Sequence, residues 1–73
     1  MNAHIKAILT KLIGERDILK ADLEVYLTNP AGIGEHPGIG HEIEVLIDKI
    51  DSLDSKIDTI NKYYGTPRTV GNG

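Results

Sequence analysis

The chain contains no cysteine, tryptophan or phenylalanine, and its aromatic residues are three tyrosines. Without cysteine it can form no disulfide and offers no thiolate ligand to a metal, which suits a reducing cytosol. No apolar run approaches the ~20 residues that cross a bilayer, and the N-terminus lacks the apolar stretch of a signal peptide. We therefore expect a cytoplasmic protein with no membrane partner.

The chain also lacks a concentration of charge of one sign. Its 73 residues include 8 basic and 11 acidic side chains, a formal net charge of -3, and the two signs are mixed along both halves. A nucleic-acid-binding domain would gather its basic residues on one stripe, but here the basic residues of the first third are interrupted by Glu15, Asp17 and Asp22. We expect one small domain with no nucleic-acid partner.

What the chain does contain is two apolar seams, in which residues recur at alternating steps of three and four. This is the heptad spacing of helices that pack along one stripe, so the sequence predicts an all-α, coiled-coil-like antiparallel hairpin of two helices. The first seam is Ile5, Leu9, Leu12, Arg16, Leu19, Leu23 and Tyr26, and the second is Ile39, Ile43, Leu46, Ile50, Leu53, Ile57, Ile60 and Tyr64.

Capping and breaking residues set the expected limits of the first helix. Asn2 can accept a hydrogen bond from the first turn, so this helix should span about residues 3–28. It should end where Asn29 precedes Pro30, because proline disfavours the helical conformation of the residue before it.

The second helix should span about residues 37–64, after a loop at 29–36. Pro37 suits a first helical turn, and the glycines that follow should fray that turn; a start at His41 is the alternative. Gly65 should end the helix as a left-handed cap, which leaves residues 1–65 as the hairpin and 66–73 as a flexible tail.

Arg16 is the one charged residue in the first seam. In an antiparallel pair, residues whose numbers sum to about 67–70 lie opposite each other, which brings Arg16 level with Asp51 and Asp54. We predict a carboxylate partner there, since a polar residue in a seam can fix register and oligomeric state. The alternative is that Arg16 lays its methylene groups along the seam and reaches solvent.

A single hairpin buries only one seam, which is little apolar area for a stable monomer. Further apolar residues widen the seams toward the face of a four-helix bundle, so we expect a homodimer of hairpins. These additional residues are Ile8, Ile13, Ile18, Val25 and Leu27 on residues 3–28, and Val45 and Ile47 on residues 37–64.

The loop holds the candidate ligand-binding residues, namely Asn29, Pro30, Gly32, Ile33, Gly34, Glu35, His36 and Pro37. Its repeated Gly-Ile-Gly could suggest a phosphate-binding loop, but no strand precedes it, and turn formation explains the glycines better. His36 and His41 are five residues apart, whereas ligands on one helical face are three or four apart. We therefore predict no metal and no cofactor.

A row of carboxylates follows the second helix at steps of three and four. It comprises Asp48, Asp51, Asp54 and Asp58. Paired carboxylates can act as general acid and base, but a row on one helix is more typical of a solvated face with ion pairs to Lys49, Lys56 or Lys62. With no activated nucleophile nearby, we expect the protein not to be an enzyme.

The loop and its flanks resemble small proteins of tailed marine phages that infect cyanobacteria. The shared stretch is Tyr-Leu-Thr-Asn-Pro-Ala-Gly-Ile-Gly-Glu-His-Pro over residues 26–37, followed by an isoleucine- and aspartate-rich segment that ends in Lys-Tyr-Tyr-Gly. The similar proteins carry an acidic residue after the last proline, where this chain has Gly38. The resemblance covers about residues 20–65 and implies a phage origin and the cytoplasm of an infected cell, but no activity.

Two functions remain open at this point. The first is a small helical interaction protein that self-associates and binds an unknown protein partner through its loop end or its residual apolar stripe. The second is a metal- or small-ligand-binding module that uses Glu35, His36 and His41.

Overall fold

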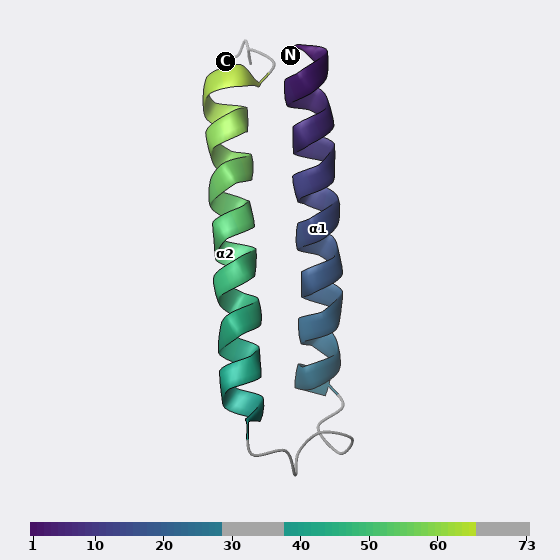
Figure 1. Cartoon of the computed structure of the whole chain (residues 1–73), viewed down its shortest axis with the longest axis vertical. Helices are drawn as coiled ribbons and strands as arrows, with labels where there is room; N and C mark the ends of the chain where they lie inside the picture. The colour runs from purple at the N-terminus through teal and green to yellow at the C-terminus, as the bar shows by residue number, and fades with distance from the viewer. Residues whose placement is uncertain (29–37, 66–73) are drawn as a thin grey trace.

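The computed structural model describes residues 1–28 and 38–65, and these residues form two helices and no strand. α1 spans Ala3–Thr28 and α2 spans Ile39–Tyr64, each with 26 residues. The helices run antiparallel and side by side along their whole length, so the start of α1 lies beside the end of α2 (Figure 1). This confirms the predicted all-α helical hairpin. The loop and tail predicted at 29–36 and 66–73 lie outside the described residues.

α1 begins where its capping residue predicts. The side-chain Oδ1 of Asn2 accepts a hydrogen bond of 2.8 Å from the backbone N–H of Ile5, and the Asn2 carbonyl accepts one of 2.9 Å from Lys6. Asn2 thus satisfies an N–H group that the first turn would otherwise leave without a partner.

α2 begins at Ile39, two residues after the predicted start near Pro37, which lies outside the described residues, and two residues before the alternative at His41. Gly38 is the N-cap, with φ -100° and ψ 13°, and its carbonyl accepts the first helical hydrogen bond from Glu42 at 3.0 Å. Glycine has a low helix propensity because ordering its backbone costs more entropy than ordering that of any other residue. This disfavours Gly38 as a helical residue, although the helix accommodates Gly40 in its first turn.

α2 ends at Tyr64, but Gly65 is not the left-handed cap that the sequence predicted. Its φ of -73° and ψ of 166° are extended backbone, and its N–H donates a 3.2 Å hydrogen bond to the Asn61 carbonyl. A Cβ atom at this position would lie 2.5 Å from that same carbonyl oxygen. Glycine fits here because the backbone passes so close to the last helical turn.

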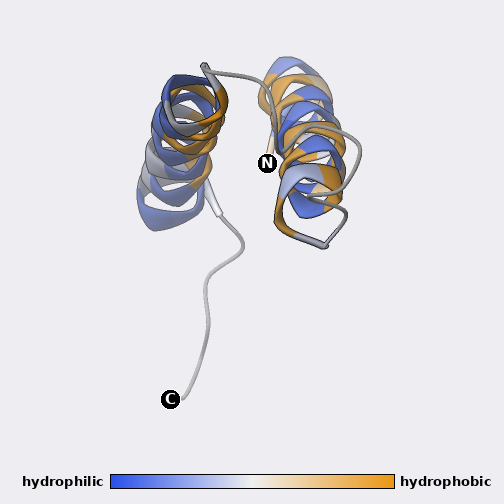
Figure 2. Cartoon of the chain, turned by 90° about the horizontal axis from the view of Figure 1, so that it is seen from below, coloured by the Kyte–Doolittle hydropathy of each residue, from blue (hydrophilic) through white to orange (hydrophobic). Residues whose placement is uncertain are grey.

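The core lies between the facing seams and is small. Among the described residues only Leu12 and Ile57 are buried, at 8% and 5% exposure, and the other seam residues are partly buried except Tyr64, which is 57% exposed. Coloured by hydropathy, α2 has its apolar residues on the side that faces α1, whereas those of α1 spread around more of the helix (Figure 2). α1 therefore carries apolar side chains that the hairpin does not cover.

Candidate interaction surface

Arg16 reaches across the seam to α2. Its Nη1 donates a 3.2 Å hydrogen bond to Oδ1 of Asp54, and its Nε donates a 3.3 Å hydrogen bond to Oδ1 of Asp17 on the same helix. The Arg16 side chain is 26% exposed and that of Asp54 is 47% exposed, so the pair sits at the edge of the seam. The predicted carboxylate partner is confirmed, and the contact brings residues 16 and 54 to about the same level of the antiparallel pair.

This contact favours the charged form of Arg16. The hydrogen bond from the guanidinium to Asp54 raises the pKa of Arg16, against the opposing effect of partial burial, and Asp17 adds to the increase. Because an arginine side chain is already protonated at any pH at which proteins are handled, the seam always contains a positive charge here.

The structure brings the remaining seam candidates to the contact between the helices. All of them are buried or partly buried, and they are Leu9, Leu12, Leu19 and Leu23 on α1, and Ile43, Leu46, Ile50, Leu53 and Ile57 on α2. None of the nine carries a polar side chain, so their packing stabilises the hairpin without specifying any chemistry.

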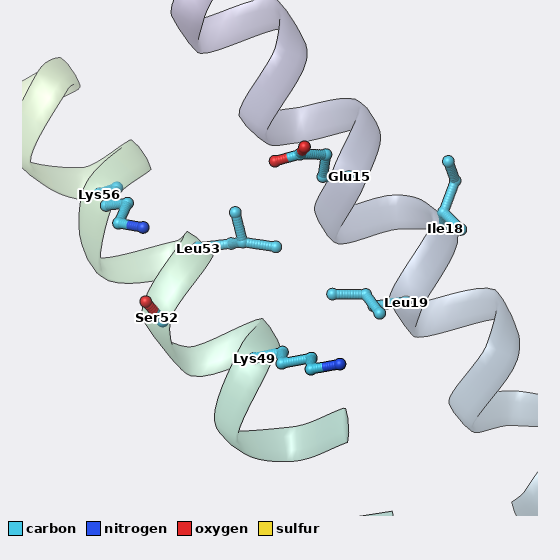
Figure 3. Close-up of a pocket in the computed structure, with 7 residues that line it drawn as sticks. All are labelled: Glu15, Ile18, Leu19, Lys49, Ser52, Leu53 and Lys56. Atoms are coloured by element: carbon cyan, nitrogen blue, oxygen red, sulfur yellow. The ribbon is translucent and has the colours of Figure 1, made fainter. Parts of the chain in front are cut away.

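A groove of about 430 Å³ runs along one side of the hairpin, between the two helices. Leu19 and Leu53 point toward one another across it, Lys49 extends from α2 toward α1, and Ile18 points away from α2 (Figure 3). Glu15 lines the groove from α1, and Ser52 and Lys56 line it from α2. We call this the Leu19–Leu53 groove.

The Leu19–Leu53 groove continues toward the loop end of the hairpin through an adjoining hollow that shares Lys49. This hollow is lined from α1 by Asp22, Val25 and Tyr26, and from α2 by Glu42, Val45, Leu46 and Lys49. Along its length the groove thus has a floor of leucines, two carboxylates on the α1 wall, and two lysines on the α2 wall, with Glu42 beyond the lysines toward the loop end.

The opposite side of the hairpin has its own groove, but a salt bridge crosses it. This second groove is lined by Arg16, Lys20, Leu23, Ile47, Ile50, Asp51 and Asp54. The Arg16 to Asp54 hydrogen bond spans it, so a molecule that covered this side would have to desolvate an ion pair.

Large apolar side chains remain exposed beside both grooves. Ile18 is 63% exposed and Val25 is 56% exposed next to the Leu19–Leu53 groove, and Ile47 is 51% exposed on the opposite side. Ile8 and Leu27 on α1 are also exposed, at 46% and 57%. Single exposed apolar residues are ordinary, but a set of this size on two helices gives a surface suited to association.

The carboxylates of α2 do not form the ion pairs that the sequence predicted. Asp48, Asp51 and Asp58 are exposed, and among the described residues no ion pair joins any α2 carboxylate to a lysine of the same helix. The exposed helix surface lets long lysine side chains stay solvated, because holding one in a surface ion pair costs side-chain entropy. Asp54 alone is engaged, and its partner is Arg16.

The ligand-binding candidates of the loop, Asn29, Pro30, Gly32, Ile33, Gly34, Glu35, His36 and Pro37, lie outside the described residues. His41 is described and is exposed in the first turn of α2. Within residues 1–28 and 38–65 no group of three or more His, Cys, Asp or Glu side chains is arranged to hold a metal ion.

Sequence reasoning missed the charged walls of the Leu19–Leu53 groove. Glu15 and Asp22 are seven residues apart, and so are Lys49 and Lys56, which puts each pair on one face of its helix. That spacing was readable in the sequence. Which side of the hairpin each pair flanks became clear only when the helices were placed against each other.

In the described part of the chain, neither helix combines the length and the apolarity that a membrane span requires. Comparison of the chain with models of known protein families found no match, and comparisons with curated proteins and with solved structures found none either.

Proposed function

We propose that this chain is a small non-enzymatic interaction protein whose hairpins self-associate into a homodimeric four-helix bundle. One observation carries the proposal: two helices of 26 residues each bury only Leu12 and Ile57 among the described residues, while five large aliphatic side chains of α1 and α2 stay about half exposed or more. The five are Ile8, Ile18, Val25, Leu27 and Ile47.

Burial of apolar surface is the main force that stabilises both folding and association. A chain of this size buries a smaller share of its surface than a larger domain does, so oligomerisation is a common source of additional stability. A second hairpin would cover seam residues that are now only partly buried, such as Leu19 and Leu53. The proposed role is therefore to present helical surface, first to a second copy and then, through what remains exposed, to a protein partner.

The resemblance of the loop to phage proteins supports a phage-encoded origin and a role in the cytoplasm of the infected cell. In that setting a small helical dimer would act by binding another protein of the phage or the host. We assign no reaction to the hairpin.

Sedimentation equilibrium of the full chain over low to high micromolar concentration tests the proposal. We expect the weight-average mass to rise toward twice the chain mass of 8.0 kDa, and the helical circular dichroism signal to increase with it. A fully helical monomer across the whole range would refute self-association.

A further inference from the structure

We infer that the Leu19–Leu53 groove is the surface on which a second copy of this chain docks, with the twofold axis parallel to the helices. The inference rests on the proposed self-association and deepens it, because it names the face, the orientation and the charge pairs.

The two walls of the groove carry opposite charges. On α1, Glu15 and Asp22 flank the exposed Ile18, and on α2, Lys49 and Lys56 flank Ser52. Lys49, Lys56 and Asp22 form no ion pair with any described residue, and Glu15 has only a 3.9 Å contact with Lys11. The wall charges are therefore available to a molecule that covers the groove.

A second hairpin fits this pattern in one orientation. A twofold axis parallel to the helices sets α1 of one copy against α2 of the other, so each carboxylate wall meets a lysine wall. An axis perpendicular to the helices within the interface would instead set α1 against α1, with like charges in contact. Opposed like charges disfavour that second arrangement.

The opposite charges of the two copies also lie at similar positions along the helix axis. In the register fixed by Arg16 and Asp54, Glu15 of one copy comes within about two residues of the level of Lys56 of the other, and Asp22 within about two residues of Lys49. Two residues of helix correspond to about 3 Å of rise, which a lysine side chain can span. Glu42 lines the same hollow as Asp22 and Lys49, but in this register it lies about six residues, or about 9 Å of rise, nearer the loop end than Asp22.

Two further observations favour this face over the opposite one. Ile18 and Val25, 63% and 56% exposed, lie beside the groove and would be covered together with its leucine floor. The opposite groove is crossed by the Arg16 to Asp54 hydrogen bond, whose desolvation would oppose docking.

The size of the face suits a dimer as well. Two adjacent helices about 39 Å long and about 10 Å wide each present a projected face of roughly 800 Å² per copy, which is of the order of the accessible area that one partner buries in a stable interface. The geometry thus offers enough surface for a second copy without any other element of the chain.

Charge reversal tests the inference. The variant Lys49→Glu with Lys56→Glu should dimerise at least ~10-fold more weakly than the wild type in sedimentation equilibrium, because both walls are then acidic. The variant Glu15→Lys with Asp22→Lys should also dimerise more weakly than the wild type, because both walls of its groove are then basic. An equimolar mixture of the two should recover a heterodimer of wild-type affinity and helicity, even where either variant alone is poorly folded.

Matched controls carry the same charge change on the other side of the hairpin. Lys20 and Asp51 line the opposite groove, and heptad spacing places Lys6 and Asp58 on the same helix faces. The control Lys6→Glu with Lys20→Glu changes the net charge by the same amount as Lys49→Glu with Lys56→Glu. The control Asp51→Lys with Asp58→Lys changes it by the same amount as Glu15→Lys with Asp22→Lys. Both controls should keep wild-type dimerisation.

The outcomes separate the two hypotheses. If the wild type dimerises and only the control variants weaken it, docking uses the opposite face, so this inference fails while self-association stands. If the wild type is monomeric, both fail, and the groove is free for a different protein. Heterodimer recovery in the mixture supports the face. Weakening of both charge-reversal variants on their own supports the axis, because the perpendicular axis already opposes like charges in the wild type.

Discussion

Gly14 is the position at which one added methyl group tests the hairpin most directly. It lies in the interior of α1, it is exposed, and a Cβ atom built there would meet nothing within 4 Å outside its own helix backbone. Glycine in a helix interior is less stable than alanine by about 1 kcal/mol, because its backbone loses more entropy on folding. Since the added methyl group would touch no other side chain of the described residues, Gly14→Ala should stabilise the protein by that amount.

The expected shift is large enough to measure. A change of about 1 kcal/mol moves the melting temperature of a domain of this size by about 4–8 °C. Thermal and urea denaturation should be followed by circular dichroism at several protein concentrations, since self-association makes the melting temperature depend on concentration. Gly14 lines neither groove, so the dimer dissociation constant should stay at the wild-type value.

Gly65→Ala is the matched control, because it is the same chemical change where the structure leaves no room. The new Cβ would lie 2.5 Å from the Asn61 carbonyl oxygen, so the last turn of α2 must shift and the melting temperature should not rise. A Gly14→Ala protein that melts at or below the wild-type temperature would refute the free helix surface assigned to this position. Equal increases at both positions would contradict the close approach at Gly65.

Three other predictions follow from the described contacts. Leu12→Ala should lower the free energy of unfolding by about 2–3 kcal/mol in urea titrations, at the low end for a buried leucine, because Leu12 is still 8% exposed. Arg16→Leu should raise the free energy of unfolding and let the protein populate more than one oligomeric state. An unchanged melting temperature together with an unchanged oligomeric state would contradict a role of Arg16 in fixing the register. A cation with a raised pKa stabilises the fold at every pH below its ordinary pKa, and it loses this effect only as the pH rises through the raised value. The difference in unfolding free energy between wild type and Arg16→Leu should therefore be the same at about pH 7 and about pH 10. Zinc or nickel should leave the melting temperature of the full chain unchanged, whereas a clear increase that is lost in a His41→Ala variant would favour a metal site.

The sequence was sufficient to predict the two helices and their register. The three- and four-residue steps of the seams have one physical interpretation over so long a stretch, and Asn2 is a side chain whose oxygen can cap a first turn. The antiparallel register brought Arg16 level with Asp51 and Asp54, and the structure pairs it with Asp54. These features depend on local helix geometry and on one long-range constraint, the antiparallel pairing of the two helices. Both can be inferred from the residue spacing in the sequence.

The glycines were harder to interpret. Gly38 and Gly65 were correctly recognised as residues near helix ends, but glycine tolerates many backbone conformations, so its presence does not say which one is used. Gly38 serves as the N-cap of α2 rather than as part of its first turn, and Gly65 is extended rather than left-handed. The side of the hairpin flanked by Lys49 and Lys56 was likewise undetermined, because it depends on how the helices rotate against each other.

The place of the best-buried residues in the hairpin has a consequence for folding. Leu12 and Ile57 lie at one level of the register but about 45 residues apart in the chain, whereas Tyr26 and Ile39, nearer the loop, are only 13 apart. Closing the longer segment costs about 1 kcal/mol more chain entropy than closing the shorter one. The helices should therefore begin to pair at the loop end, and the deepest burial lies in the half of the hairpin farther from the loop, where chain entropy would otherwise favour separation of the helices.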